Sequence, residues 1–399
     1  MKTICSKKDL WLIRLYYFVL FGALGYILPF LNLYYDRLGI SAGHIGIFVT
    51  VNSVVSLIVS PMVGLMIGMF PKPVRIIQIE LILSGIVLAL IGLNESVPIL
   101  ALLVGLNALL FAGVYPTSIS IAQSIAEHAP GKVGFGSIRL FGSLGWAIVT
   151  YGAGLAIEKY GMVVVFIGYG VFVLVGAWLL GCIKFTEEIG MGESESKGMK
   201  LTSVLSAVVK DKALVGFGLM VLISYGALIG VRQFEVLFMD QLGAPESIIG
   251  LAFTIAALVE IPFMILSDRL IDKINSTNVL RLSLLLELAR LIFVALFPSV
   301  PIILIGRAIT GIAYALNIVA LVKFIHERAP RGQNVTLQAL YNITIPNMIS
   351  ILASPVIGSV FDARSGYAMY YIGIIGLIAA TIVFLITVRG KRSRVGASV

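Results

Sequence analysis

The sequence predicts an all-α integral membrane protein with twelve transmembrane helices in two pseudo-symmetric six-helix bundles. Three observations predict this fold: an apolar composition, about twelve long apolar stretches, and a pattern that recurs after half the chain. Of 399 residues, 59% are hydrophobic and 12% are charged, and the mean hydropathy is +1.03. About a quarter of the residues in a soluble domain are charged, so most of this surface must face lipid. A helix needs roughly 20 apolar residues to cross a bilayer.

The apolar stretches define the predicted spans, in order along the chain. The first is too long and too aromatic for the apolar core of a cleavable signal peptide, so we interpret it as a span. Between the sixth and seventh lies the only long polar stretch, residues 185–210, which we predict to be a cytoplasmic linker. It separates an N-terminal bundle, 1–184, from a C-terminal bundle with a short basic tail, 211–399. The twelve spans are 10–35, 44–69, 74–93, 97–126, 134–158, 162–184, 211–238, 246–271, 277–297, 299–325, 333–360 and 365–388.

The basic residues are concentrated in alternate loops, and the other loops hold little beyond Arg37, Lys159 and Arg364. This positive-inside pattern predicts a multi-pass protein of the cytoplasmic membrane with both termini in the cytoplasm. The net charge of +9 is divided among these loops rather than gathered on one face, so we expect no nucleic-acid partner. The clusters are Lys2, Lys7 and Lys8; Lys72 and Arg75; Lys197, Lys200, Lys210 and Lys212; Arg269 and Lys273; Arg328 and Arg331; and Arg389, Lys391, Arg392 and Arg394.

The two halves resemble each other in loop positions, several of them polar, which disfavours chance similarity between apolar stretches. Two six-helix halves of the same orientation are typical of alternating-access carriers, whose substrate site lies between the halves near the membrane midplane. We therefore expect a small-molecule substrate, a monomer in the lipid bilayer, and no cofactor. The matches are Leu38-Gly39 with Leu242-Gly243, Gly46 with Gly250, and 127–130 with 327–330.

Three ionisable residues are predicted near one level inside the membrane. At about 1.5 Å per residue, Glu260 lies about 18 Å and Arg290 about 22 Å from the inner ends of their spans, and Arg307 about 12 Å from the outer end of its span. Ionisable side chains at this depth are rare and often mark a pathway. An acid flanked by two arginines stays ionised, and substrate binding would loosen the pairing and let Glu260 take a proton. A purely structural ion pair is the alternative.

Arg139 and Trp146 form a second candidate group. They lie seven residues apart, so both project from one face of the fifth span. A guanidinium forks onto hydroxyl or carboxylate groups, and an indole offers a ring for stacking. Equally, Arg139 is placed where a snorkelling arginine would lie at the inner interface. Asn32 and Asn107 complete the predicted substrate-binding set.

Other intramembrane charges receive structural roles. Glu80 and Glu287, one in each half, lie closer to the cytoplasmic ends and are predicted to anchor gates. Arg232 and Glu235 are predicted to form an i,i+3 salt bridge at the outer interface rather than to bind a ligand.

The loop after the eighth span carries Asp268, Arg269, Asp272 and Lys273, which resembles the acid-plus-base loop motif of the major facilitator superfamily. The resemblance implies that these charges clasp the inner gate. Gly68 stands where the N-terminal copy of the motif has its acid, so the clasp is expected on one side only.

Residues 135–147, which include Arg139 and Trp146, resemble the fifth helix of the lactose permease group, and much of the chain is similar to its phenylpropionate-permease branch. The resemblance implies that Arg139 and Trp146 bind and stack on substrate. Ile119 replaces the acid that pairs with the sugar-binding arginine, so galactoside specificity is not supported. Thr310 and Ala313 replace the tenth-helix relay of that group, so proton coupling would depend on Glu260.

We therefore expect a proton-coupled symporter for a sugar, an aromatic acid or a nucleoside, driven by the proton gradient. A proton-driven efflux antiporter is the alternative, although the glycine-proline antiport motif is absent from the fifth span. An enzyme is not expected, because His44, His128 and His326 are scattered and no metal-spaced set occurs.

Overall fold

The computed structural model describes residues 6–66, 73–130, 133–184, 206, 208–330 and 333–388, and every regular element among them is helical. The described residues contain eleven helical segments long and apolar enough to cross a membrane. The ninth predicted span, 277–297, corresponds to α12 (Ser276–Leu296), which is not among these eleven: it is long enough but carries Arg281, Glu287 and Arg290. The prediction of an all-α membrane protein with paired helix bundles is confirmed, and the predicted spans match helices throughout.

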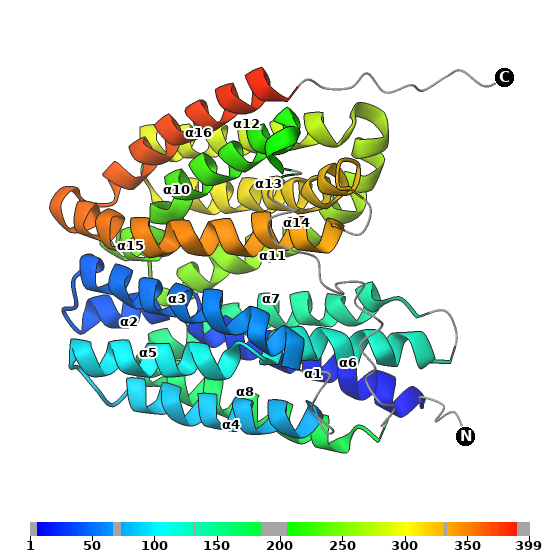
Figure 1. Ribbon diagram of the computed structural model, residues 1–399. Coiled ribbons are helices and arrows are strands. Elements are labelled where there is room, and N and C mark those ends of the chain that lie inside the picture. The colour runs from blue at the N-terminus through cyan, green and yellow to red at the C-terminus, as the bar shows by residue number, and fades with distance from the viewer. Residues whose placement is uncertain are drawn as a thin grey trace. The chain divides into compact units, whose positions relative to one another are not determined.

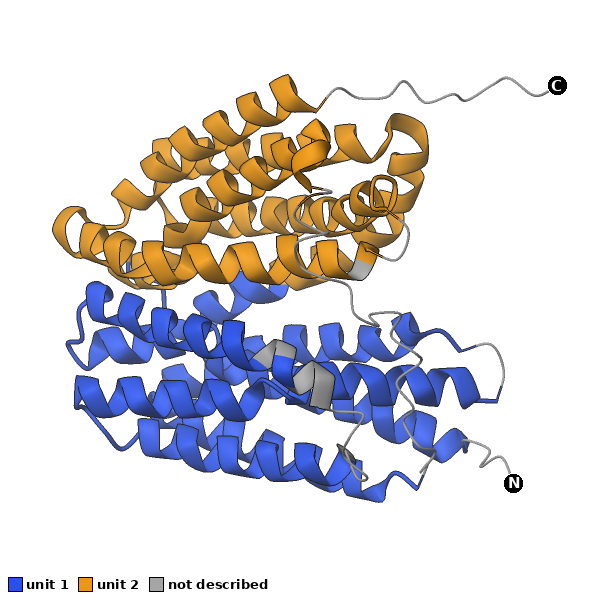
Figure 2. Cartoon of the chain, in the orientation of Figure 1, with its two compact units in different colours: residues 1–193, 243–254 blue, residues 194–242, 255–399 orange. Residues whose placement is uncertain are grey.

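The chain divides into two compact units (Figure 2). The first unit comprises residues 1–193 and 243–254, and the second comprises 194–242 and 255–399, so the first turns of α11 belong to the first unit. The predicted linker, 185–210, falls mostly outside the described residues, and its boundaries stay a prediction. The helices of the first unit are α1 (Lys7–Ile27), α2 (Leu31–Arg37), α3 (Ala42–Met66), α4 (Pro73–Ile91), α5 (Val97–Phe111), α6 (Val114–His128), α7 (Phe135–Tyr160) and α8 (Val163–Cys182).

The second unit contains α10 to α16 (Figure 1). A short π-helical turn, η2, joins α14 to α15, and Pro346 stands at the start of α15. A proline has no N–H to donate, so it interrupts helical hydrogen bonding. The helices are α10 (Lys212–Gln241), α11 (Glu246–Ile274), α12 (Ser276–Leu296), α13 (Val300–His326), α14 (Asn334–Ala339), η2 (Leu340–Thr344), α15 (Ile345–Arg364) and α16 (Tyr367–Thr387).

Glycines let helices of the first unit approach closely. α1 and α7, distant in sequence, pack side by side (Figure 1). A Cβ atom at Gly145 of α7 would lie 2.1 Å from the backbone oxygen of Phe18 in α1. Gly250 of α11 meets the Thr150 backbone of α7 in the same way, and Thr254 Oγ1 donates to the Ala147 carbonyl at 2.6 Å. Helix association in lipid depends on such backbone proximity.

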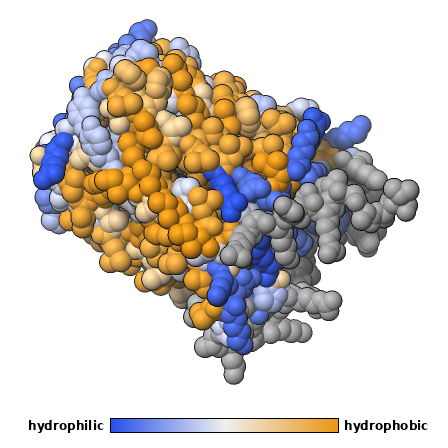
Figure 3. Space-filling model, turned by 90° about the horizontal axis from the view of Figure 1, so that it is seen from above, coloured by the Kyte–Doolittle hydropathy of each residue, from blue (hydrophilic) through white to orange (hydrophobic). Residues whose placement is uncertain are grey.

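The outer surface of the helices is apolar. One face of the molecule is largely hydrophobic, with hydrophilic residues gathered toward its ends (Figure 3). Ile375 and Ile386 on α16 are 70% and 74% exposed, and Leu352 on α15 is 74% exposed. Large exposed aliphatic side chains on consecutive helices are what contact with lipid tails requires.

Candidate functional site

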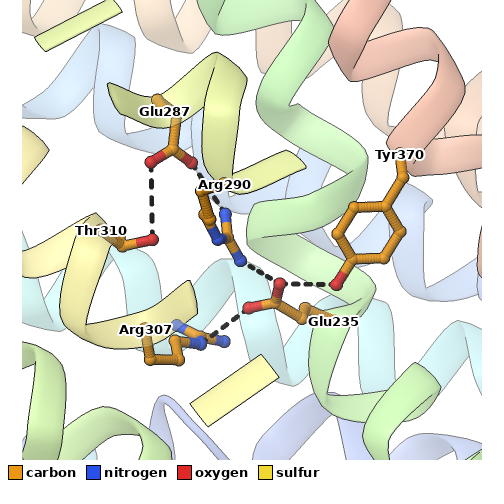
Figure 4. A network of polar contacts seen from close by, with 6 residues as sticks. All are labelled: Glu235, Glu287, Arg290, Arg307, Thr310 and Tyr370. Carbon is orange, nitrogen blue, oxygen red and sulfur yellow. Dashed lines mark hydrogen bonds and ion pairs between the residues drawn. The ribbon is translucent and has the colours of Figure 1, made fainter. Parts of the chain in front are cut away.

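A network of charged and hydroxyl side chains joins four helices of the second unit (Figure 4). The Glu235 side chain of α10 is 1% exposed and lies between two arginines. Its Oε1 accepts a hydrogen bond from Arg290 of α12, and its Oε2 lies 2.7 Å from Nε of Arg307 of α13. The Tyr370 hydroxyl of α16 donates to Oε1 at 2.7 Å. Both carboxylate oxygens of Glu235 therefore face positive charge.

Arg290 links Glu235 to a second carboxylate, Glu287, one turn earlier on α12. Arg290 Nη1 donates to Glu287 Oε1 at 2.7 Å, and Thr310 Oγ1 of α13 lies 3.4 Å from Glu287 Oε2. The Glu287 side chain is 13% exposed. Two carboxylates and the guanidinium groups of Arg290 and Arg307 give the network no net charge. Neutral pairing lowers the free energy needed to hold ionised groups inside a membrane.

Glu235 and its two arginines meet because each lies at a similar distance from its helix end. Glu235 and Arg290 each precede the last residue of their helix by six positions, and Arg307 follows the first residue of α13 by seven. At 1.5 Å per residue, each lies about 10 Å from the connections at this end of the unit. The two arginines thus lie at one level, as the sequence predicted.

The predicted interfacial pair of Arg232 with Glu235 is wrong. Arg232 is exposed, and its guanidinium lies 4.6 Å from the centre of the Tyr225 ring, while Glu235 points into the bundle. The residues one turn before and after Glu235, Val231 and Phe238, are buried and apolar. A position flanked in this way lies on the core face of its helix. That pattern was the signal in the sequence for a buried acid.

Glu235 occupies the place between the two arginines that the sequence assigned to Glu260. Glu260 lies on α11 and is partly exposed. Depth along a helix, the quantity behind that prediction, does not tell in which direction around the helix a side chain points. The role of Glu260 in proton coupling stays a prediction.

Arg139 lies on α7 of the first unit and reaches toward α1. Its guanidinium lies 4.2 Å from the centre of the Phe21 ring, and Nη1 donates to Ser143 Oγ at 3.1 Å. Ser143 is one turn further along α7, whereas snorkelling would turn the guanidinium back toward the start of the helix. Within the described residues no acid forms an ion pair with Arg139. Several of its N–H donors are therefore available to a ligand.

Trp146 lies two turns beyond Arg139 on α7. Its ring packs edge-on against Phe253, with 6.5 Å between the ring centres. Asn107 of α5 belongs to a different contact: its Oδ1 accepts a hydrogen bond from Ser84 at 2.6 Å, and Ser84 Oγ lies 2.7 Å from the Tyr169 hydroxyl. Asn32 lies on α2 and is partly exposed.

Comparison with known proteins places these two bundles in a family. The model of the MFS_1 like family matches residues 10–344. The chain belongs to this family. The predicted membership of the major facilitator superfamily is confirmed, and this MFS_1-like protein is a multi-pass membrane transporter of small solutes rather than an enzyme.

Two relatives match over most of their length. The chain is 25% identical over 357 residues to the uncharacterized transporter YwbF of Bacillus subtilis (strain 168), covering 89% of this chain and 87% of that protein. It is 24% identical over 389 residues to the maltose permease of Geobacillus stearothermophilus, covering 95% and 94%.

Solved structures share the fold. A mutant form of the nucleoside transporter NupG matches with a TM-score of 0.83 and 13% identity, covering 96% of this chain and 100% of that one. A bacterial homolog of the human lysosomal transporter Spinster, inward-facing and unoccupied, matches with a TM-score of 0.68 and 15% identity, covering 95% and 94%.

The predicted gate motif of this MFS_1-like protein lies on a helix, not in a loop. Asp268, Arg269, Asp272 and Lys273 belong to the last two turns of α11, where all four are exposed. The placement in a loop is corrected because α11 continues to Ile274. Opposite charges within these two turns support an exposed helix, and Asn275, with φ of 68°, then joins α11 directly to α12. The role of these charges as a clasp stays a prediction. Residues 67–72 of the matching N-terminal segment lie outside the described residues.

The side chains of the Glu235 network and of the pair Arg139 and Trp146 can form hydrogen bonds and ion pairs, and the carboxyl groups of the network can exchange protons. Within the part of the chain that the structure describes, no group of three or more His, Cys, Asp or Glu side chains could hold a metal ion. Of the six residues in the network, the sequence predicted only Arg290 and Arg307 as members; it gave Glu287 a separate role as a gate anchor and did not mark Glu235, Thr310 or Tyr370 as members. Tyr370 is 1% exposed, and neither composition nor spacing marked it.

Proposed function

We propose that this MFS_1-like protein is a secondary active transporter that carries a sugar or a nucleoside across the cytoplasmic membrane, by alternating access and in symport with protons. It acts as a monomer with both termini in the cytoplasm. The observation that carries the proposal is the neutral network of Glu235, Glu287, Arg290 and Arg307 inside a membrane bundle. Ionisable groups at this depth are costly, and they mark ion and proton pathways in transporters.

Glu287 is the acid of the network that best suits a coupled proton. Glu235 faces two arginines and a tyrosine hydroxyl, whereas Glu287 contacts Arg290 and, at 3.4 Å, Thr310. Opposite charges favour the ionised form of an acid, so protonation costs less at Glu287. Once Glu287 is neutral, Arg290 has Glu235 as its remaining acid in the network. The network then carries a charge of +1, which favours a rearrangement of α12 against its neighbours.

Arg139 and Trp146 suit a solute with a hydroxylated ring. Among the described residues no acid pairs with the guanidinium, which offers forked N–H donors, and the indole offers a flat apolar face. The names of the related maltose permease and of the structurally similar nucleoside transporter support this substrate class. An aromatic acid, whose carboxylate would pair with Arg139, is the third candidate.

Counterflow in proteoliposomes tests the proposal. Vesicles loaded with unlabelled sugars, nucleosides or aryl acids are diluted into the labelled compound, with protein-free vesicles as control. We expect exchange with a sugar or nucleoside, and net uptake that rises when the outside is made acidic. Accumulation inside vesicles whose lumen is acidic would instead identify a proton-driven antiporter. Exchange that ignores the pH gradient would reject proton coupling.

A further inference from the structure

The first unit holds an acidic residue at membrane depth that plays no part in the proposed mechanism. Glu80 lies on α4 seven residues after Pro73, about 10 Å into a helix about 28 Å long. The hydrocarbon core of a bilayer is about 30 Å thick. At this depth the Glu80 side chain, which is partly exposed, lies among apolar helices.

The Glu80 carboxyl group rests against a break in a neighbouring helix. α5 ends at Phe111 and α6 begins at Val114, and a Cβ atom on Gly113, between them, would lie 2.7 Å from Glu80 Oε1. A side chain there would force the carboxyl group to shift. Because Pro116 has no N–H, it cannot donate the helical hydrogen bond to the carbonyl of Ala112. The Ala112 carbonyl therefore lacks this helical donor.

Within the described residues, Glu80 has no partner that would stabilise a negative charge. Its Oε2 is buried and lacks a hydrogen-bond partner, and no basic side chain of this part of the chain forms an ion pair with it. The helices that pack against α4 carry the titratable residues Tyr169 and Cys182 on α8, and Tyr115, Glu127 and His128 on α6, with Glu127 and His128 in the last turn of α6, away from the break. Tyr16 of α1 is paired with Ser118 at 2.7 Å, and Tyr169 of α8 is paired with Ser84. Tyr115 of α6 is exposed and packs edge-on against Phe21, with 6.2 Å between the ring centres.

The second unit contains an informative contrast. α4 and α12 are the third crossings of their units, and each is followed by a helix that begins with the same four residues, Ser-Val-Pro-Ile, at 96–99 and 299–302. Glu80 and Glu287 lie 11 and nine residues before the ends of these helices. Glu287 is neutralised by Arg290, whereas position 83 of α4 is a leucine. A buried carboxylate without a counter-charge costs far more free energy than a neutral carboxylic acid.

We propose that Glu80 is a proton-binding site of the first unit, which holds a proton as a neutral carboxylic acid and donates it in a hydrogen bond to a backbone carbonyl at the α5–α6 break. The proton leaves when the break or the carboxyl group becomes exposed to water. The site lies outside the network of the second unit and goes beyond the proposed function. Its test is therefore independent of proton symport through Glu287.

Infrared difference spectroscopy of the protein in lipid vesicles tests the site directly, as the pH is stepped from about 5 to about 9, the interval into which burial in apolar surroundings moves the titration of a carboxyl group. We expect a carboxylic-acid C=O band that disappears reversibly as the pH rises. The band should be missing in Glu80→Gln and retained in Glu95→Gln, which removes an exposed acid from the connection between α4 and α5. An unchanged band in Glu80→Gln would overturn the proposal, as would a band that the pH does not alter.

A second measurement needs no substitution, in case Glu80→Gln does not fold. Dicyclohexylcarbodiimide modifies carboxylic acids in their protonated form within apolar surroundings, and mass spectrometry of the wild-type protein locates the adduct. We expect modification of Glu80 at acidic pH that falls as the pH is raised. Absence of the adduct at acidic pH would contradict the proposal. Gly113→Ala, which crowds the carboxyl group, should change the pH at which labelling is half lost; no change would also count against it.

Discussion

Nε of Arg307 lies 2.7 Å from Oε2 of Glu235, and this ion pair ties α13 to α10 in the interior of the second unit. The two side chains are 11% and 1% exposed. Arg290 approaches the other oxygen of the same carboxylate. Loss of the acid would therefore leave two guanidinium groups facing each other, with Glu287 as the remaining carboxylate of the network.

Glu235→Gln should lower the free energy of unfolding by about 3–5 kcal/mol, the usual cost of removing one partner of a buried ion pair. Thermal unfolding of purified protein in detergent measures the effect. The double variant Glu235→Gln/Arg307→Gln should recover part of the loss, because one uncompensated charge disappears with it. A double variant less stable than the single variant would contradict this description of the network.

Tyr370→Phe removes a single hydrogen bond, the 2.7 Å contact with Glu235 Oε1. Hydrogen bonds to charged groups contribute about 1.5–3 kcal/mol, so the unfolding midpoint should fall measurably. Tyr371→Phe is the matched control, because the adjacent side chain is 55% exposed and should tolerate the change. Equal midpoints for the two variants would show that the Tyr370 hydroxyl is not held by the network.

Gly145→Ala should destabilise the first unit severely, because the new Cβ would lie 2.1 Å from the Phe18 backbone oxygen. The backbones could relieve this overlap only if α7 moved away from α1. Gly152→Ala on the same helix meets open space, and helix propensity predicts a gain of up to about 1 kcal/mol. Detergent-solubilised yield and unfolding midpoint distinguish the two variants. Similar behaviour of both would contradict the close packing of α1 and α7.

The twelve spans were predictable because each needs only a long apolar run, and the helices of both units follow those runs within a few residues. The ion network was only half predictable. Arg290 and Arg307 were recognised from their depth. The direction in which a side chain must point around its helix depends on which helices pack together, and the residues next to it in the sequence do not specify that packing. Glu235 was therefore assigned to Arg232, although the apolar residues one turn away marked a core face.

The candidate substrate residues show the same limit. The seven-residue spacing of Arg139 and Trp146 predicted one face of α7, but it could not decide between a snorkelling and an inward arginine. The contacts of Arg139 with Phe21 and Ser143 separate these two possibilities, and the contact with Phe21 requires the packing of α1 against α7. Asn107 was chosen by type and depth alone, and its contact with Ser84 had no signature in the spacing.

Arg139→Ala should weaken solute binding by roughly tenfold to a hundredfold, as expected when one charge-assisted hydrogen bond of about 1.5–3 kcal/mol is lost. Concentration-dependent counterflow of the solute identified with the panel measures this. Lys159→Ala, at the other end of α7, is the control, because Lys159 is exposed and should leave the affinity unchanged. An unaltered affinity in Arg139→Ala would remove Arg139 from the binding site.

Glu260→Gln separates the two candidate coupling acids of the second unit. If Glu287 carries the coupled proton, Glu260→Gln should still accumulate solute under an imposed pH gradient. Loss of accumulation in this variant, with exchange retained, would return the coupling role to Glu260. Uptake by Glu260→Gln and Glu287→Gln in the same vesicle preparation gives the comparison.

Solute-induced proton movement tests the central claim most directly. In proteoliposomes with an external pH indicator, addition of solute should make the medium more alkaline for the wild-type protein. Glu287→Gln should still exchange labelled solute but produce no alkalinisation, because the group that accepts the proton is gone. Solute entry without alkalinisation in the wild type, or alkalinisation at the wild-type rate in Glu287→Gln, would contradict proton coupling through this network.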